Sequence, residues 1–287
     1  MTFMSRAFLL ALLLTALPVH ADDGVIDWQL YNQPPLSMLD GPNRGQGVLN
    51  LGLNKLLLPK LTQYGHQMTE VPIKRLVLAL KTQPNACAFG LLKNPEREAF
   101  MQFSLPILPQ LPPGVVVRRG EYEALQPFLN RDGALQLKSW LLSGSGRLGV
   151  TDGRSYGAAV DELLTPLRGT ARVAVVAADA PVRNLLQMVM LGRLEMAVSL
   201  PYEARYLQEA EGMDTRVLRF VPLAEQPRQL VGYAACAKGP FGAGVIRRIN
   251  EVLAQPDVQS ALIGYYERWL DEDSRQLARA ARAPSSP

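Results

Sequence analysis

The chain has 287 residues, of which 48% are hydrophobic and 20% are charged, and its formal net charge is +4. Positive and negative charges are interspersed and form no basic block, which argues against nucleic acid as a partner. Two histidines and two cysteines are too few for a His-rich zinc site, and we expect neither a metal nor a cofactor.

The first 21 residues have the three-part composition of a secretory signal peptide. Arg6 is the only charge before an apolar run of 13 residues, 7–19, and Val19-His20-Ala21 has the small-x-small form of a cleavage site. The run is shorter than the roughly 20 residues that a membrane-spanning helix needs. We therefore expect a periplasmic protein that begins near Asp22 and, without Arg6, has a net charge of +3 (+4 less one).

His66 is the one histidine that remains after export. A Cys/His or Ser/His/Asp catalytic group would have to use it. It lies between a predicted helix and a predicted strand, where we expect a solvated loop histidine. The sequence therefore favours a protein that is not an enzyme.

Strand and helix patterns alternate from residue 25 to residue 92. Residues 25–32 alternate as a strand does, and residues 48–61 have the apolar spacing of a helix. A strand at 67–71, a helix at 72–83 that opens with proline and a buried strand at 85–92 follow. This order predicts an α/β fold with a mostly parallel sheet.

A proline-rich connection, residues 109–120, leads to a second α/β set. Its predicted helices are 134–144, 158–167, 181–193 and 202–212, and its predicted strands are 147–150, 172–178 and 194–200. An extended segment, 216–239, returns to the first set, and helices at 242–255 and 257–270 precede a tail that we expect to be frayed.

This layout predicts two lobes with two connections and a ligand cleft between them. Lobe one is expected to comprise residues 22–116 and 233–287, and lobe two residues 117–232.

Two glycine-containing motifs have different meanings. Gly144, Gly146 and Gly149 satisfy G-x-G-x-x-G, but the motif leaves a helix and enters a strand, so we reject it as a dinucleotide site. The turn 151–157 has the strand-to-helix order, and Ser155 is predicted at the helix N-cap. Ser155 then either caps the helix or contacts a ligand, and Arg154 would add a positive charge.

Cys87 and Cys236 lie in similar apolar, strand-like segments. Cysteine pairs in exported proteins usually form a disulfide, and the two strands would be neighbours if the return segment joins the sheet of lobe one. The alternative is two buried free thiols.

Four segments together resemble the exported solute-binding proteins of the polar amino acid uptake type (extracellular solute-binding protein family 3). They are "DGPNRGQG", "PEREAFMQFSLPI", "LGVTDGRSYG" and "GRLEMAVSL", and their order and spacing cover nearly the whole mature chain. The resemblance implies a type II periplasmic binding protein fold, in which two lobes close on a small solute. It is closest to a two-cysteine branch with "CxxGLxKxxER" and a "YxAC" return strand.

The resemblance also implies roles for individual residues. Arg97 matches the arginine that holds a ligand carboxylate, and Ser155 matches a hydroxyl residue that assists it. Gly90 and Leu92 stand where hydroxyl residues are usual, and Leu200 and Pro201 stand where an acid binds the ligand ammonium, with Glu203 the nearest candidate. The alternative for Arg97 is a surface ion pair with Glu96 or Glu98.

Three further residues are candidates for the cleft. Tyr31 and Gln33 follow the first strand and are expected to contact the ligand, whereas Trp28 on that strand is expected in the core. Arg75, in the first turn of its helix, is expected to reach the cleft mouth.

The predicted function is capture of a small anionic or zwitterionic, amino-acid-like solute by a monomer, for an ABC transporter in the membrane. A module that signals to a membrane sensor is the first alternative. An enzyme on the same fold or a ligand-free interaction module are the others. The role in transport rests on analogy of fold.

Overall fold

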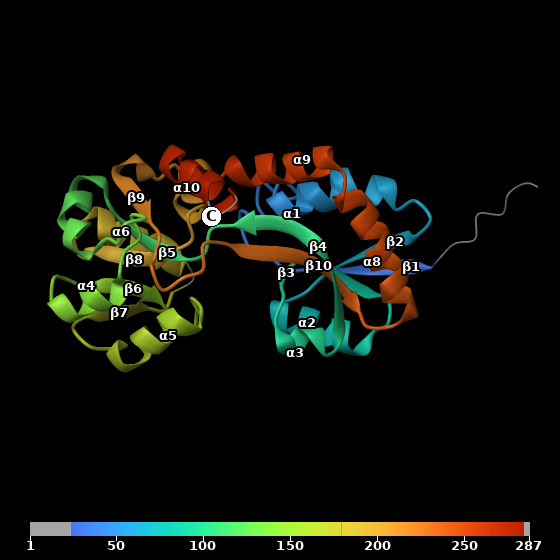
Figure 1. Ribbon diagram of the computed structural model, residues 1–287, viewed down its shortest axis with the longest axis horizontal. Coiled ribbons are helices and arrows are strands. Elements are labelled where there is room, and N and C mark those ends of the chain that lie inside the picture. Colours follow the sequence, from blue (N-terminus) through green and yellow to red (C-terminus); the bar gives the residue numbers. More distant parts are fainter. Residues whose placement is uncertain (1–23, 179, 284–287) are drawn as a thin grey trace, which may run out of the picture.

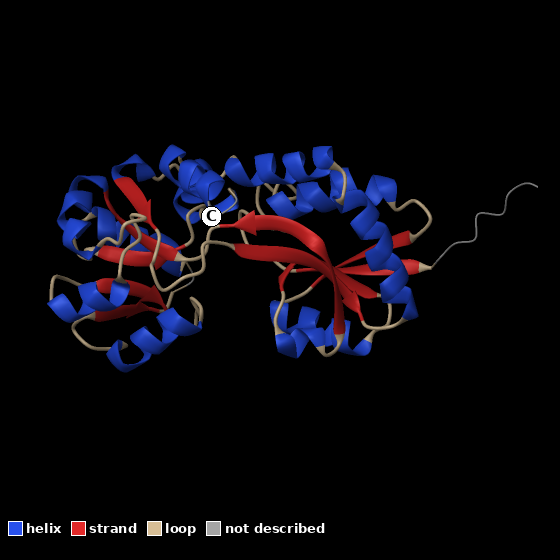
Figure 2. Cartoon of the chain, viewed as in Figure 1, coloured by secondary structure: helices blue, strands red, loops and turns tan. Residues whose placement is uncertain are grey.

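The computed structural model describes residues 24–178 and 180–283, and the predicted signal peptide lies outside the described residues. Two lobes lie side by side, and each contains a five-stranded sheet (Figure 1). Helices lie above and below the strands of each lobe (Figure 2). The predicted two-lobe α/β fold is therefore confirmed.

The sheet of lobe one has the strand order β2-β1-β3-β10-β4. Strand β1 pairs in parallel with β2 and β3, whereas β10 is antiparallel to both β3 and β4. Its strands are β1 (Val25–Leu30), β2 (Gly65–Glu70), β3 (Ala86–Leu92), β4 (Met101–Gln110) and β10 (Leu230–Ala237).

The sheet of lobe two has the order β7-β6-β8-β5-β9. Strand β6 is parallel to β7 and β8, and β5 is antiparallel to β8 and β9. Its strands are β5 (Gly114–Arg118), β6 (Leu148–Thr151), β7 (Val173–Val176), β8 (Met196–Ser199) and β9 (Leu218–Val221).

The helices cover these sheets with their apolar sides. Leu76 and Leu80 of α2, for example, are buried against lobe one. The α-helices are α1 (Val48–Leu51), α2 (Ile73–Thr82), α3 (Pro95–Glu98), α4 (Leu137–Ser143), α5 (Ala158–Leu164), α6 (Pro181–Met190), α7 (Glu203–Glu211), α8 (Pro240–Leu253), α9 (Pro256–Glu267) and α10 (Glu272–Arg282). A π-helical segment (Gly52–Leu57) continues α1, and the longest 3-10 segment is η3 (Arg119–Phe128). In the described part of the chain, none of the helices is both long and apolar enough to cross a membrane.

Two connections join the lobes: residues 111–113 link β4 to β5, and residues 222–229, which include a turn, link β9 to β10. The predicted lobe boundaries (22–116 with 233–287, and 117–232) remain a proposal. The structure adds that the C-terminal residues, predicted to belong to lobe one, contact lobe two, because Arg119 pairs with Asp273 at 2.6 Å and Arg228 donates to the Ala280 carbonyl at 2.9 Å.

Strand β4 has no counterpart among the predicted elements, because Pro106 and Pro109 lie within it. It is an edge strand of the sheet, because it pairs with β10 on one side and, among the described residues, with no strand on the other. Proline is tolerated on an edge strand because the missing N–H faces no partner. Two register shifts between β10 and β4 lie near these prolines.

Cys87 of β3 and Cys236 of β10 form a disulfide, and the two residues lie directly opposite each other in the antiparallel register. The predicted pairing is therefore confirmed, and the alternative of free thiols is wrong. The bond joins residues 149 positions apart and fixes the return strand in the sheet of lobe one. Both cysteines are fully buried.

Replacing both cysteines (Cys87→Ala with Cys236→Ala) should lower the free energy of unfolding by about 2–5 kcal/mol, since a bridge over a long loop restricts the unfolded chain. Urea unfolding of the variant and of the oxidised protein measures the difference. Alkylation followed by mass spectrometry is the control, and two reactive thiols in the native, unreduced protein would contradict the bridge.

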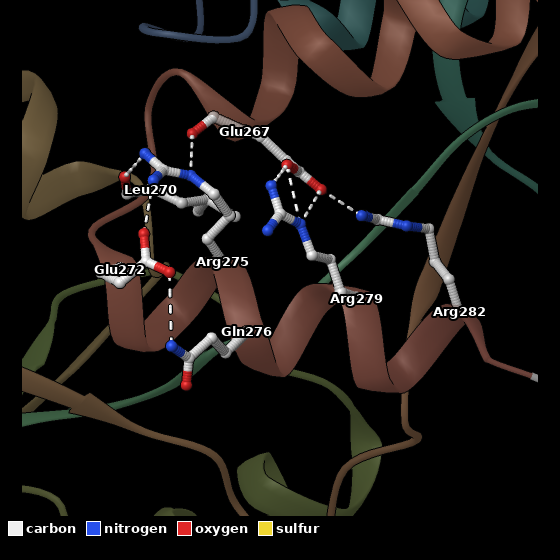
Figure 3. A network of polar contacts seen from close by, with 7 residues as sticks. All are labelled: Glu267, Leu270, Glu272, Arg275, Gln276, Arg279 and Arg282. Carbon is white, nitrogen blue, oxygen red and sulfur yellow. Dashed lines mark hydrogen bonds and ion pairs between the residues drawn. The ribbon is translucent and has the colours of Figure 1, made fainter.

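The expected frayed tail is wrong for residues 272–282, which form α10. Glu267 at the end of α9 accepts hydrogen bonds from Arg279 and Arg282 (Figure 3). Asp271 caps α10 by accepting from the Ser274 N–H. Burial alone would raise the pKa of Glu267, but the hydrogen bonds from the two arginines hold it below its usual value. Charged residues that suggested a solvated tail therefore bind α10 to α9.

Aromatic contacts attach the end of α9 to lobe two. The rings of Tyr202 and Tyr266 meet edge to face at 6.2 Å, and those of Tyr206 and Trp269 are tilted at 6.0 Å. The Tyr266 hydroxyl accepts from the Leu111 N–H at 3.0 Å, on the first connection between the lobes. The C-terminal helices thus belong to the hinge region.

The lowered pKa of Glu267 predicts a pH-dependent contribution to stability. This contribution is present above the unfolded glutamate pKa of about 4.3 and is lost as the pH falls through the lower folded value. The difference in unfolding free energy between wild type and Glu267→Gln should therefore shrink between about pH 6 and pH 3. Denaturant melts at several pH values test this. Glu251→Gln, which removes an exposed pair on α8, is the control and should have little effect.

Candidate functional site

A cavity of about 210 Å³ lies where the loop after β1 meets helices α6 and α7. We call it the interlobe crevice, because Pro34 comes from lobe one and the other residues come from lobe two. Its lining residues are Pro34, Ala180, Pro181, Val182, Arg183, Glu203, Tyr206, Leu207 and Glu211.

Arg97 lies on α3, a single turn that begins with Asn94 as its cap. The Asn94 side chain accepts from the Arg97 N–H at 2.8 Å, and the Arg97 Nη1 donates to the Leu92 carbonyl at 2.7 Å. Glu98 pairs with Lys93 instead, at 2.8 Å. Among the described residues no carboxylate lies within ion-pair distance of Arg97, so the surface-pair alternative does not account for it.

Tyr31 connects Arg97 with the other lobe. Its hydroxyl donates to Gln33 Oε1 at 2.7 Å, and burial raises the pKa of Tyr31 while the nearby Arg97 charge opposes the rise. Burial also raises the pKa of Tyr202 in lobe two, and the nearby Tyr31 adds a little to this increase. Tyr31 therefore lies near Arg97 of lobe one and near Tyr202 of lobe two. Figure 1 shows α3 and α5 on facing sides of the two lobes.

Arg154 and Glu203 form an ion pair at 2.8 Å, from the turn after β6 to the first residue of α7. Glu203 also accepts from Ser199 Oγ and from the Leu200 N–H, each at 2.7 Å. Burial alone would lower the pKa of Arg154, but the Glu203 carboxylate raises it above its usual value. The candidate acid for a ligand ammonium is therefore already bound within the protein.

The predicted N-cap position of Ser155 is wrong, because α5 begins at Ala158 with Gly157 as its cap. Gly157 has a φ of +101°, a conformation that glycine adopts readily, and this moves the helix start beyond the serine. The exposed Ser155 hydroxyl donates to Asp161 Oδ2, and Asp161 Oδ1 accepts from the Tyr156 N–H at 2.9 Å. A role of Ser155 in ligand contact stays a prediction.

The described residues that line the crevice include none of the predicted ligand contacts, which are Arg97, Tyr31, Gln33, Arg154, Ser155 and Arg75. Arg75 is exposed on α2 and has no side-chain contact with the crevice within the described ranges, so its role also stays a prediction. Trp28 is fully buried, as expected of a core residue. Its indole Nε1 donates to His66 Nδ1 at 3.2 Å.

His66 is therefore not the solvated loop histidine that the sequence favoured. It lies on strand β2, paired with Ile26, and burial lowers its pKa. Its place on the edge strand of lobe one separates it from Arg97 and Glu203. Elsewhere, no group of three or more His, Cys, Asp or Glu side chains in the described residues is arranged to hold a metal ion.

Sequence reasoning missed Arg183, Tyr202 and Tyr206, which lie in or beside the crevice. Their one signal is position, since they lie in or next to the first turns of α6 and α7, the helices that follow strands β7 and β8, at the edge where ligands of α/β sheets bind.

Neither family models nor curated protein sequences match the chain. Solved structures do match. An ancestral cationic amino acid solute-binding protein has a TM-score of 0.62 at 19% identity, over 88% of this chain and 98% of the other. A probable amino-acid ABC transporter extracellular-binding protein, YtmK of Bacillus subtilis, has a TM-score of 0.63 at 16% identity, over 87% and 98%.

A third match is the periplasmic VFT2 domain of Bordetella pertussis BvgS, with a TM-score of 0.56 at 20% identity, over 87% and 95%. These likenesses show that the chain has the two-lobe fold of solute-binding proteins, as the resemblance in its sequence implied.

A double-mutant cycle on Arg154→Met and Glu203→Gln should give a coupling free energy of about 1–3 kcal/mol, because both side chains are mostly buried. Urea unfolding of the four proteins measures it. The matched control is the pair Arg183–Glu211 in the same crevice, which is more exposed and should couple by less than about 1 kcal/mol. Equal coupling free energies for the two pairs would contradict the argument that burial strengthens the Arg154–Glu203 pair.

Proposed function

We propose that this protein binds a small anionic or zwitterionic, amino-acid-like solute between its lobes and presents it to an ABC transporter. Arg97 carries the proposal, because it is a half-buried cation beside Tyr31 without a carboxylate partner among the described residues. Its Nη1 bond to Leu92 orients the guanidinium and leaves Nη2 and Nε as possible donors to a carboxylate.

Several features support capture without chemistry on the solute. The three structural matches are two solute-binding proteins and the periplasmic VFT2 domain of BvgS. The crevice has no histidine or cysteine among its lining residues. The two connections between the lobes suit closure by rotation about a hinge. We propose a periplasmic monomer, consistent with the secretory pattern of residues 1–21.

Signalling to a membrane sensor is the second candidate. The likeness to the periplasmic VFT2 domain of BvgS is the observation that favours it, although the transporter-associated YtmK has the higher TM-score.

Arg97→Ala should weaken carboxylate binding by about 100-fold, the loss expected for two charge-assisted hydrogen bonds. A thermal-shift screen with amino acids, dicarboxylates, polyamines and peptides identifies the solute, since binding raises the melting temperature with ligand concentration. The variant is then titrated with the solute that bound.

The control is Arg216→Ala, which removes an exposed arginine paired only with Asp214 and should leave binding unchanged. A solute that binds Arg97→Ala as tightly as wild type would contradict the role of Arg97. Chemical conversion of the bound solute would favour an enzyme on the same fold. If none of the compounds raises the melting temperature, a ligand-free interaction module would be favoured.

A further inference from the structure

We propose that the solute is a carboxylate without a charged amino group, which selects the anionic over the zwitterionic class. This inference rests on the proposed function and on the pairing of charges around the interlobe crevice.

Lobe one contributes one cation to the site. Arg97 is held by Asn94 and by the Leu92 carbonyl, and no carboxylate among the described residues neutralises it. Leu92, at the end of β3, accepts from Arg97 Nη1 through its carbonyl and exposes 41% of its surface near this end of the strand. This combination favours a carboxylate whose remainder is not positively charged.

Among the described residues, lobe two lines the crevice with two carboxylates, and both are engaged by arginines. Arg154 pairs with Glu203 at 2.8 Å, and Arg183 Nε pairs with Glu211 at 2.7 Å. Glu203 accepts two more hydrogen bonds, from Ser199 and Leu200, so three of its roughly four acceptor positions are occupied.

A ligand ammonium would therefore have to displace an arginine or lose its hydration without compensation. Displacing Arg154 leaves a mostly buried guanidinium unpaired, because its other near neighbour is the face of Tyr156 at 5.7 Å. Other acids near the facing edges are Asp40, Glu96 and Asp152, which are exposed and do not line the crevice. Asp40 accepts a hydrogen bond from Asn32 Nδ2 at 2.9 Å. An α-amino group next to Arg97 would also meet its positive charge.

The experiment compares ligands that differ only in the amino group. Calorimetric titration of the full mature protein uses L-glutamate with glutarate, L-leucine with 4-methylpentanoate, L-phenylalanine with 3-phenylpropanoate and L-aspartate with succinate. In each pair that binds, the deamino compound should have a dissociation constant lower by about tenfold or more.

Arg154→Gln should weaken or abolish this preference, because it releases Glu203 to accept an ammonium. The ratio of the two dissociation constants in a pair should shift by about tenfold toward the amino acid. Arg216→Gln, outside the crevice, should leave the ratio unchanged, and circular dichroism melts confirm that each variant is folded. The wild-type comparison decides the matter even where the Arg154 variant does not fold.

Tighter or equal binding of the amino acids by wild type overturns the inference and leaves the proposed function in place. Binding of none of the eight compounds at millimolar concentration counts against both. If wild type prefers the deamino compounds and Arg97→Ala loses their binding, the result supports both the proposed function and this inference.

Discussion

The insertion of β10 between β3 and β4 is the constraint on which the two-lobe structure depends. The chain leaves lobe one after β4, builds the whole of lobe two, and can complete the first sheet only by returning through this slot. Because β3 and β4 would otherwise be separated by an unpaired gap, the return is required to satisfy their backbone groups. The disulfide between Cys87 and Cys236 makes that return covalent.

Charge pairing follows from the same architecture. Strand ends of lobe two bring Arg154 and Glu203 together, and their mutual neutralisation leaves lobe two with little net charge at the crevice. Across the gap, α3 presents Arg97 without such a partner in the described part of the chain. The asymmetry between a neutralised lobe and a cationic lobe gives the site its expected ligand charge, since an anion is the natural partner of a half-buried cation that has no carboxylate beside it among the described residues.

The fold was largely predictable, because strands such as β3 and helices such as α2 carry clear hydrophobic periodicity. Strand β4 was not, since edge position makes its prolines acceptable and only the sheet order reveals the edge. The site was predictable only in part. Arg97 follows from a local motif, whereas the engagement of Glu203 by Arg154, 49 positions apart, depends on how β6 and β8 are placed. The prediction that Ser155 is the N-cap was wrong because the N-cap of α5 lies two residues later than expected, at Gly157.

The α9–α10 pair limits how the lobes can move relative to each other. Glu267 binds α10 to α9, which packs against β4 and α1 of lobe one, while Asp273 at the start of α10 pairs with Arg119 of lobe two. A rotation that keeps both sets of contacts must have its axis close to these helices, because displacement grows with distance from the axis. Figure 1 shows them on the side of the molecule opposite α3 and α5, so such a rotation moves the facing sides of the lobes most. Closure would therefore act where Arg97 lies and would leave the hinge contacts of Tyr202 with Tyr266 in place.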